Sequence, residues 1–294
     1  MFSFDLLANA IVAGVLLGGF YAAVSLGLTI AFGQLDVVNI AHPIFIVFGS
    51  FCTFVAHERL GLDPVLTGIL LMPFFFVIGV ALYSVYYSSF ERRGDDALRG
   101  LAFFFGILFI VEVLLIMTFG VDYRLVETAY IGESIHLGDI GIPFRLLVPF
   151  LVAVVMTSAL YFYLSRTFIG RAILAVSQDR LALQLMGADP VRIKRIAFGL
   201  ALATTAVAGA LLIMIQPVEP SVGRLYIGRA FAIVVLGGMT SISGTFVAAL
   251  LLGVVESLVA TFIGPSWAPA VAFGFLLITL AVRPAGETSP DWRD

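Results

Sequence analysis

The chain has 294 residues, of which 61% are hydrophobic and 12% charged, with a net charge of −3 and a mean hydropathy of +1.10. Soluble domains carry about 45–50% apolar and about 25% charged residues, so this composition excludes a soluble protein and indicates an integral membrane protein. The single cysteine, Cys52, lies in an apolar run, and the three histidines are scattered. We therefore expect neither a disulfide framework nor a metal site.

Eight apolar runs are long enough to cross a hydrocarbon core of about 30 Å as helices. They cover residues 6–31, 37–56, 65–89, 98–120, 144–164, 191–215, 229–263 and 266–283. The runs are continuous rather than alternating, which disfavours a β-barrel. We predict an all-α, polytopic integral membrane protein of eight to nine transmembrane helices. One transmembrane domain would cover residues 1–284, with a polar tail over residues 285–294.

A polar constellation follows the first run, at the start of the second. It consists of Gln34, Asp36, Asn39 and His42, followed by Pro43. Asp36 is expected to cap the second helix, and Pro43 to kink it. Asn39 and His42 are three residues apart and would share a helix face. Two interpretations stay open: a structural hydrogen-bond network at a helix start, or part of a translocation path or its gate.

Basic residues are concentrated in two loops. Residues 90–99 hold three arginines, and residues 165–195 hold six basic residues, Arg166, Arg171, Arg180, Arg192, Lys194 and Arg195. The loops lie two spans apart and so share a side, which the positive-inside rule assigns to the cytoplasm. Counting back places the N-terminus outside. The C-terminus lies inside if the seventh run makes two passages, and outside if it makes one.

Two acidic residues, Glu112 and Glu256, lie inside apolar runs with no basic residue close by on the same helix. An ionised carboxylate there is costly unless it has a partner. Each should be protonated, paired across helices or facing water. A structural or subunit-interface role is favoured over a proton relay.

The segment from Gly170 to Phe198 is amphipathic and rich in arginine. Gly170 to Ala172 is expected to end a span, and a short helix should follow. The apolar face of that helix consists of Ala182, Leu185 and Met186. Gly187 should stop it, and Asp189 and Pro190 should begin the next span as cap and first-turn residue. Such a helix lies along the membrane surface or docks on a partner.

The seventh run, residues 229–263, is too long for one ordinary helix. Small and polar residues interrupt it at Gly237, Gly238, Ser241, Ser243 and Gly244. We expect a short helix, a break and a full helix. Broken helices at membrane depth persist only where protein or a water-filled cavity covers the freed backbone.

Sequence motifs for nucleotide binding and for nucleophilic catalysis are absent. The chain has no G-x-x-x-x-G-K-[ST] pattern, and its only lysine is Lys194. No nucleophile–base pair is apparent, so the chain is not expected to be an enzyme.

Three segments carry combinations of small and polar residues in a fixed order. Residues 14–51 contain Gly-x-x-Tyr-Ala, Gly-Leu-Thr and Asn-x-Ala-His; residues 170–211 begin with Gly-Arg-Ala and contain Ala-x-x-x-x-Gly; residues 228–258 contain Gly-Gly-x-x-Ser-x-x-Gly. Together they resemble the permease subunits of ABC importers for branched-chain amino acids, in the shorter of two permease types. Pro43 departs from the pattern, because many members have glycine after the histidine. This leaves the solute open, since the family also includes importers of amides, urea and aromatic acids.

The resemblance implies a set of site residues. A cytoplasmic coupling helix within about residues 166–195 would dock into a cleft of an ATPase subunit. Its candidate coupling residues are Arg171, Asp179, Ala182 and Gly187. The candidate path residues are Gln34, Asn39, His42, Gly237, Gly238 and Gly244.

The resemblance also implies the assembly. It would contain two ATPase subunits that bind ATP and Mg²⁺, a second, longer permease and a periplasmic solute-binding protein, in a bacterial inner membrane. No cofactor and no nucleic acid would bind to this chain. One rival is an ion-coupled secondary transporter with Glu112 and Glu256 as coupling acids. The other rival is a non-transporting assembly subunit.

Overall fold

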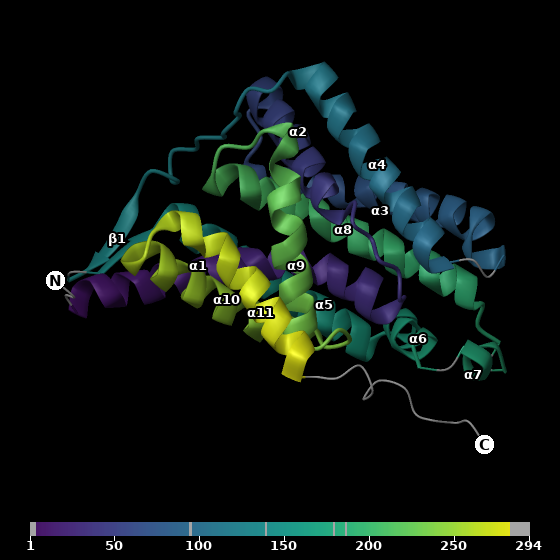
Figure 1. Cartoon of the computed structure of the whole chain (residues 1–294). Helices are drawn as coiled ribbons and strands as arrows, with labels where there is room; N and C mark the ends of the chain where they lie inside the picture. Colours follow the sequence, from purple (N-terminus) through teal and green to yellow (C-terminus); the bar gives the residue numbers. More distant parts are fainter. Residues whose placement is uncertain (1–3, 94–95, 139, 179, 186, 283–294) are drawn as a thin grey trace.

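The computed structural model describes residues 4–93, 96–138, 140–178, 180–185 and 187–282 (Figure 1). Its helices are α1 (Phe4–Leu28), α2 (His42–Leu60), α3 (Pro64–Ser89), α4 (Asp96–Phe119), α5 (Phe144–Arg166), α6 (Phe168–Val176), α7 (Arg180–Leu185), α8 (Pro190–Ile215), α9 (Gly223–Gly237), α10 (Ile242–Phe262) and α11 (Ala268–Val282). A π-helix, η1 (Thr29–Gln34), extends α1. Short 3-10 turns η2 (Glu91–Arg93), η3 (Pro220–Val222) and η4 (Pro265–Trp267) precede α4, α9 and α11.

Eight of the described helical segments are long and apolar enough to cross a membrane. They are Phe4–Gln34, His42–Leu60, Pro64–Ser89, Leu98–Phe119, Phe144–Arg166, Pro190–Ile215, Pro220–Gly237 and Ile242–Phe262. A shorter apolar segment, Pro265–Ala281, follows them. The prediction of a polytopic α-helical membrane protein is confirmed. The predicted tail, residues 285–294, lies outside the described residues.

The predicted break in the seventh run is confirmed, although the short helix begins earlier than expected. It starts with η3 and α9 rather than at residue 229, and ends at Gly237. Figure 1 shows α9 steeply inclined to α1 and α8. It packs against α1, α2, α10 and α11. Helix α9 therefore contacts both of the first two spans and the last two helices.

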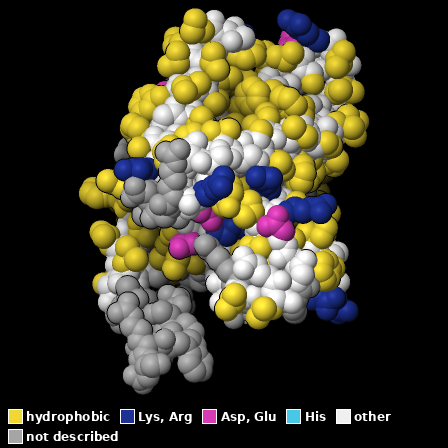
Figure 2. All heavy atoms as spheres, turned by 90° about the vertical axis from the view of Figure 1, so that its right-hand side faces the viewer, with side chains coloured by type: hydrophobic (Ala, Val, Ile, Leu, Met, Phe, Trp, Pro, Cys, Tyr) yellow, Lys and Arg dark blue, Asp and Glu magenta, His cyan; other side chains and the backbone are white. Residues whose placement is uncertain are grey.

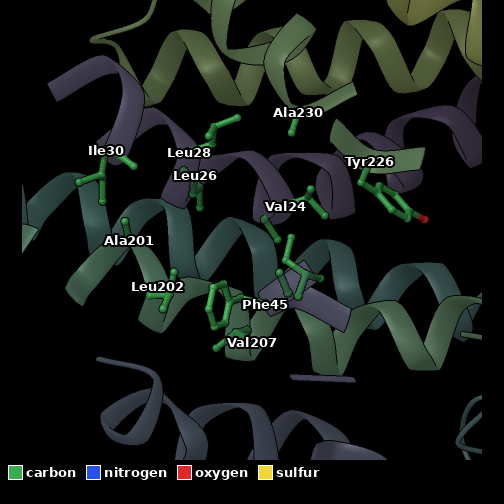
Figure 3. Packing of buried hydrophobic residues seen from close by; sticks show 14 of the residues in the cluster. Val24, Leu26, Leu28, Ile30, Phe45, Ala201, Leu202, Val207, Tyr226 and Ala230 are labelled. Atoms are coloured by element: carbon green, nitrogen blue, oxygen red, sulfur yellow. The ribbon is translucent and has the colours of Figure 1, made fainter. Parts of the chain in front are cut away.

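Helix α8 is the centre of the bundle. In its most apolar stretch 89% of the residues are buried, against 22% in α3 and in α5. Small residues let neighbouring backbones approach it: a Cβ atom on Gly209 would lie 2.7 Å from the backbone nitrogen of Ser50 on α2. Figure 3 shows apolar side chains from α1, η1, α2, α8 and α9 meeting in this core.

Helices α1 and α10 pack closely at two glycines of α1. A Cβ atom on Gly14 would lie 2.6 Å from the Cα of Val254, and one on Gly18 would lie 2.6 Å from the Cα of Leu250. Such close approach allows van der Waals contact where lipid provides no hydrophobic driving force between helices.

The start of the second span differs from the prediction. Residues 35–41 are not helical, and Leu35, Val37 and Ala41 among them are buried. Asp36 has φ of +59° and does not cap α2, which begins at His42. Pro43 lies in the first turn of α2, where its missing N–H costs no helical hydrogen bond, so it produces no kink there. The sequence pattern missed this irregular segment because Val37, Val38 and Ile40 extend the apolar run of the second span backwards.

The connection between α4 and α5 contains a small element that an all-α prediction omits. Strands β1 (Ser134–Leu137) and β2 (Ile140–Pro143) pair antiparallel, with Ser134 opposite Pro143. Tyr130 donates a hydrogen bond to the Asp63 carboxylate at 2.6 Å, and Asp63 caps α3. Burial and this bond raise the pKa of Tyr130 to about 12. The hairpin and the start of α1 lie together, at the end of the molecule opposite α6 and α7 (Figure 1).

Candidate functional site

The break between α9 and α10 is a tight turn built from glycine and serine. Gly238 has φ of +84°, a conformation that favours glycine. Ser241 caps α10 by accepting a hydrogen bond from the Gly244 N–H at 3.0 Å. Gly237 and Gly244 pack directly against each other, and a Cβ atom on Gly237 would lie 2.5 Å from the backbone nitrogen of Thr245. The three candidate path glycines therefore fix the shape of the break.

Gln34, at the end of η1, joins this break to α6. Its Nε2 donates to the carbonyl oxygen of Thr240 at 2.8 Å. Its Oε1 lies 3.3 Å from the hydroxyl of Ser177, the residue that follows α6, which also donates to the carbonyl oxygen of Leu174 at 2.8 Å. The side chain is buried. Beside it, a Cβ atom on Gly33 would lie 2.5 Å from the carbonyl carbon of Met239. One amide therefore bonds to two segments that lie far apart in the sequence.

Asn39 and His42 lie in the packed interior, with 1% and 0% of their surfaces exposed. Asn39 Oδ1 accepts from the Ala41 N–H at 3.1 Å, and His42 Nε2 lies 3.1 Å from the carbonyl oxygen of Val24 on α1. Asn39 Nδ2 and His42 Nδ1 have no hydrogen-bond partner among the described residues. Buried polar atoms of this kind need an explanation, and a gate that exchanges partners is one.

The predicted glycine stop after the short helix is confirmed. Gly187 has φ of +80°, and its N–H donates to the Gln184 carbonyl oxygen at 2.9 Å. Asp189 caps α8, as predicted, by accepting from the Val191 N–H at 2.9 Å. Asp179 lies outside the described residues, as does the side chain of Ala182.

The prediction that Gly170 to Ala172 ends a span is wrong. Helix α5 ends at Arg166, and these residues lie inside the separate helix α6. Thr167 starts α6 by accepting from the Gly170 N–H at 3.0 Å. A threonine three residues before a glycine in an amphipathic stretch was the available signal. Arg171 is exposed on α6.

Helix α7 presents large apolar side chains to its surroundings. Leu181 and Leu185 are 65% and 81% exposed, whereas Leu183 is 3% exposed and holds α7 against the protein. Residues four apart on a helix share a face, so the two exposed leucines form one apolar surface. Figure 2 shows this end of the molecule, over which several basic side chains are spread.

Lys194 is a basic residue of this end that is buried. Its Nζ lies 2.5 Å from Glu91 Oε1, and its side chain is 4% exposed. The contact joins the two basic loops, which confirms that they share a side. It also shows that one of the six predicted loop cations is an internal ion pair rather than a surface charge.

Both intramembrane acids are paired across helices, one of the three outcomes expected for them. Glu112 on α4 binds Arg224, whose Nε lies 3.1 Å from Oε2. Glu256 on α10 binds Arg229 at 2.9 Å and accepts from the Tyr21 hydroxyl at 2.6 Å. Both arginines lie on α9. Within the part of the chain that the structure describes, no group of three or more His, Cys, Asp or Glu is placed to hold a metal ion.

These features define a class of protein: a polytopic α-helical membrane protein with a discontinuous helix in contact with its core. The family model described as "Branched-chain amino acid transport system / permease component" matches residues 10–280. The chain belongs to this permease family.

Named relatives cover nearly the whole chain. The permease protein BraD of the high-affinity branched-chain amino acid transport system of Pseudomonas aeruginosa is 30% identical and covers 94% of each chain. LivH of Escherichia coli K12, a permease protein of the same kind of system, is 28% identical over 93% of this chain and 92% of its own. LivM of Escherichia coli K12 is 31% identical over 48% of this chain and 34% of its own.

Proposed function

We propose that this chain is a membrane subunit of an ATP-binding-cassette importer, moving branched-chain or related amino acids into the cytoplasm by alternating access. Membership of the permease family supports the transport role, and the systems named for its relatives support the solute class. The observation that carries the mechanism is the bridge through Gln34, since it bonds to α6 on one side and to the break on the other.

The other components would be separate chains. Two ATPase subunits would bind ATP and Mg²⁺, a periplasmic protein would deliver the solute, and a second permease would complete the path. The partial similarity to LivM supports a homologous second permease. In a bacterial inner membrane, the positive-inside rule places α6, α7 and the loop over residues 90–99 in the cytoplasm and the N-terminus outside.

Coupling would begin at α7 and the residues around it. The exposed face of Leu181 and Leu185 offers the ATPase an apolar contact. The candidate coupling residues Arg171, Asp179, Ala182 and Gly187 lie within the same stretch of the sequence. ATP can switch the path only if the ATPases bind the two states with different affinity. Movement of this segment would reach Ser177, Gln34 and then the break.

The gate would consist of the break and the buried pair Asn39 and His42. The unpartnered Nδ2 and Nδ1 atoms of this pair are available to bond water or each other's backbone when α1 and α2 shift. Reconstitution tests the proposal: leucine uptake into vesicles should need ATP, both permeases, both ATPases and the binding protein. Uptake by this chain alone under a proton gradient would instead establish a secondary transporter.

Replacing Gln34 with leucine should reduce the number of leucine molecules transported per ATP hydrolysed by about tenfold, within the usual range of site-to-site coupling. The change removes both hydrogen bonds and leaves an apolar side chain of similar size in place of the amide. Ser177→Ala should have a smaller effect, because it removes only the bond to α6. Gln216→Leu is the control. Gln216 donates a hydrogen bond to the Tyr226 hydroxyl at 2.9 Å, and this bond is not part of the junction at Gln34. An unchanged transport-to-ATPase ratio in Gln34→Leu would show that the amide does not couple the two segments.

Gly187→Val should reduce the stimulation of ATP hydrolysis by the solute-loaded binding protein. A β-branched residue is strained at φ of +80° by about 1–2 kcal/mol, so the end of α7 would be displaced. Gly61→Val is the matched control. Gly61 has φ of +63° and open space around it, and it lies at the C-terminal end of α2. Equal stimulation of ATP hydrolysis in both variants would show that Gly187 has no role in coupling.

A further inference from the structure

The pair of Arg229 and Glu256 lies at an open pocket of about 260 Å³, lined by residues of α1, α5, α9, α10 and the start of α11. The polar lining consists of Tyr21, Arg229, Glu256, Ser257 and Thr261. The apolar lining consists of Ala13, Leu17, Leu146, Ala260 and Ala268. The pocket therefore combines one cation, one anion and hydroxyl groups with an aliphatic wall.

The charged groups are held in fixed positions. Arg229 Nε lies 2.9 Å from Glu256 Oε1, and the Tyr21 hydroxyl donates to Oε2 at 2.6 Å. The Glu256 side chain is 2% exposed, whereas that of Arg229 is 15% exposed, so the guanidinium retains access to the pocket. The Arg229 guanidinium also lies over the ring of Tyr226, 5.7 Å from its centre. Charges at membrane depth are costly, and residues that retain them commonly serve a ligand or an ion.

The second intramembrane pair lacks these features. Glu112 and Arg224 do not line this pocket, and the Arg224 side chain is 53% exposed. Charge neutralisation of an acid therefore does not by itself require a pocket. The cavity beside Arg229 is a separate property of the first pair.

We propose that this pocket binds the zwitterionic head group of an aliphatic amino acid. Arg229 would bind the carboxylate through its planar fork of N–H donors. Glu256, whose oxygens bond to Arg229 and Tyr21, would attract the ammonium group through its negative charge. The aliphatic side chain would lie against Leu17, Leu146 and Ala260, as an apolar pocket with few polar groups requires. This site rests on the proposed function, because it takes the solute class from there and adds the residues that recognise it.

The position of the pocket suits loading from outside. The pocket residue Ser257 donates a hydrogen bond to the carbonyl oxygen of Ala10 in the first half of α1 at 2.7 Å. Helix α1 begins at the end of the molecule that holds the N-terminus (Figure 1). Helix α7 lies at the other end. The solute would therefore bind at the end away from the ATPases, before the break in α9–α10 changes shape.

The first experiment measures binding of radiolabelled leucine to the assembled permease–ATPase complex without the binding protein. The double variant Arg229→Met/Glu256→Gln removes both charges together, which avoids a lone buried charge. We expect its Kd for leucine to rise at least tenfold. The matched control, Arg224→Met/Glu112→Gln, should keep the Kd of the unaltered complex. Equal Kd values in all three complexes would overturn the site.

The second experiment tests the ligand chemistry and its source. Thr261→Cys in a Cys52→Ser background gives a single thiol at the pocket, and leucine should slow its alkylation by a membrane-impermeant maleimide. 3-Methylbutylamine, which lacks the carboxylate, and 4-methylpentanoate, which lacks the amine, should give little protection. A phospholipid with an amine head group shares the zwitterionic chemistry, so vesicles are made with and without phosphatidylethanolamine. Protection by that lipid but not by leucine would overturn the solute assignment.

The two proposals fail in different ways. If the complete importer does not take up leucine, the proposed function fails. If it takes up leucine equally well with the double variant Arg229→Met/Glu256→Gln, only the pocket assignment fails.

Discussion

Replacing Gly33 with valine should prevent the chain from accumulating as a folded protein in the membrane. The Cβ atom of any other residue at this position would overlap the carbonyl oxygen of Met239, with the carbonyl carbon only 2.5 Å away. Both groups are backbone, so no side-chain rotation can relieve the contact. Overpacking usually costs about 1–3 kcal/mol, and a clash of backbone with backbone should exceed that range.

Protein yield and thermal unfolding in detergent measure this effect. Gly106→Val is the control, because a Cβ atom on Gly106 of α4 would meet no heavy atom within 4 Å among the described residues. Its unfolding temperature should change only by the small amount that the difference in helix propensity between glycine and valine produces. A Gly33→Val protein as stable as the control would mean that η1 and the break are not packed as described.

Replacing Glu256 with leucine should destabilise the protein by about 3–5 kcal/mol, the usual cost of removing one partner of a buried ion pair. Arg229, at 15% exposure, would lose its carboxylate partner, and the Tyr21 hydroxyl would lose its acceptor. The double variant Arg229→Met/Glu256→Leu should recover most of the loss, because no lone charge remains. Thermal unfolding of the assembled complex in detergent is the measurement.

The stability comparison is independent of solute binding. If the single and double variants unfold at the same temperature as the unaltered protein, the pair contributes nothing to folding, and its charges would be free to serve the pocket alone. Recovery in the double variant together with lost leucine binding would show that the pair has both roles.

Features that arise from local chemistry could be predicted from the sequence. The spans followed from long apolar runs, the break from the cluster that includes Gly238, and the restart at Asp189 from its capping chemistry. Each of these depends on residues within one or two helical turns. Local patterns of this kind need no knowledge of what lies across the bundle.

Features that arise from distant contacts could not be predicted. The partner of Glu112 is Arg224, 112 positions away, and Gln34 bonds to Thr240 across 206 positions. A single sequence, taken alone, carries no signal for such pairs. The irregular start before His42 was missed for another reason: its apolar residues suit a buried extended segment as well as a helix.

The pairing of both intramembrane acids with arginines has an electrical consequence. Moving one elementary charge across a membrane potential changes the energy by about 2.3 kcal/mol per 100 mV. Glu112 and Glu256 each have a compensating arginine on α9, so displacement of that helix together with its partners carries no net charge from these four residues. An amino acid zwitterion is itself neutral. In the proposed importer, the direction of transport would be set by nucleotide binding rather than by the voltage across the bilayer.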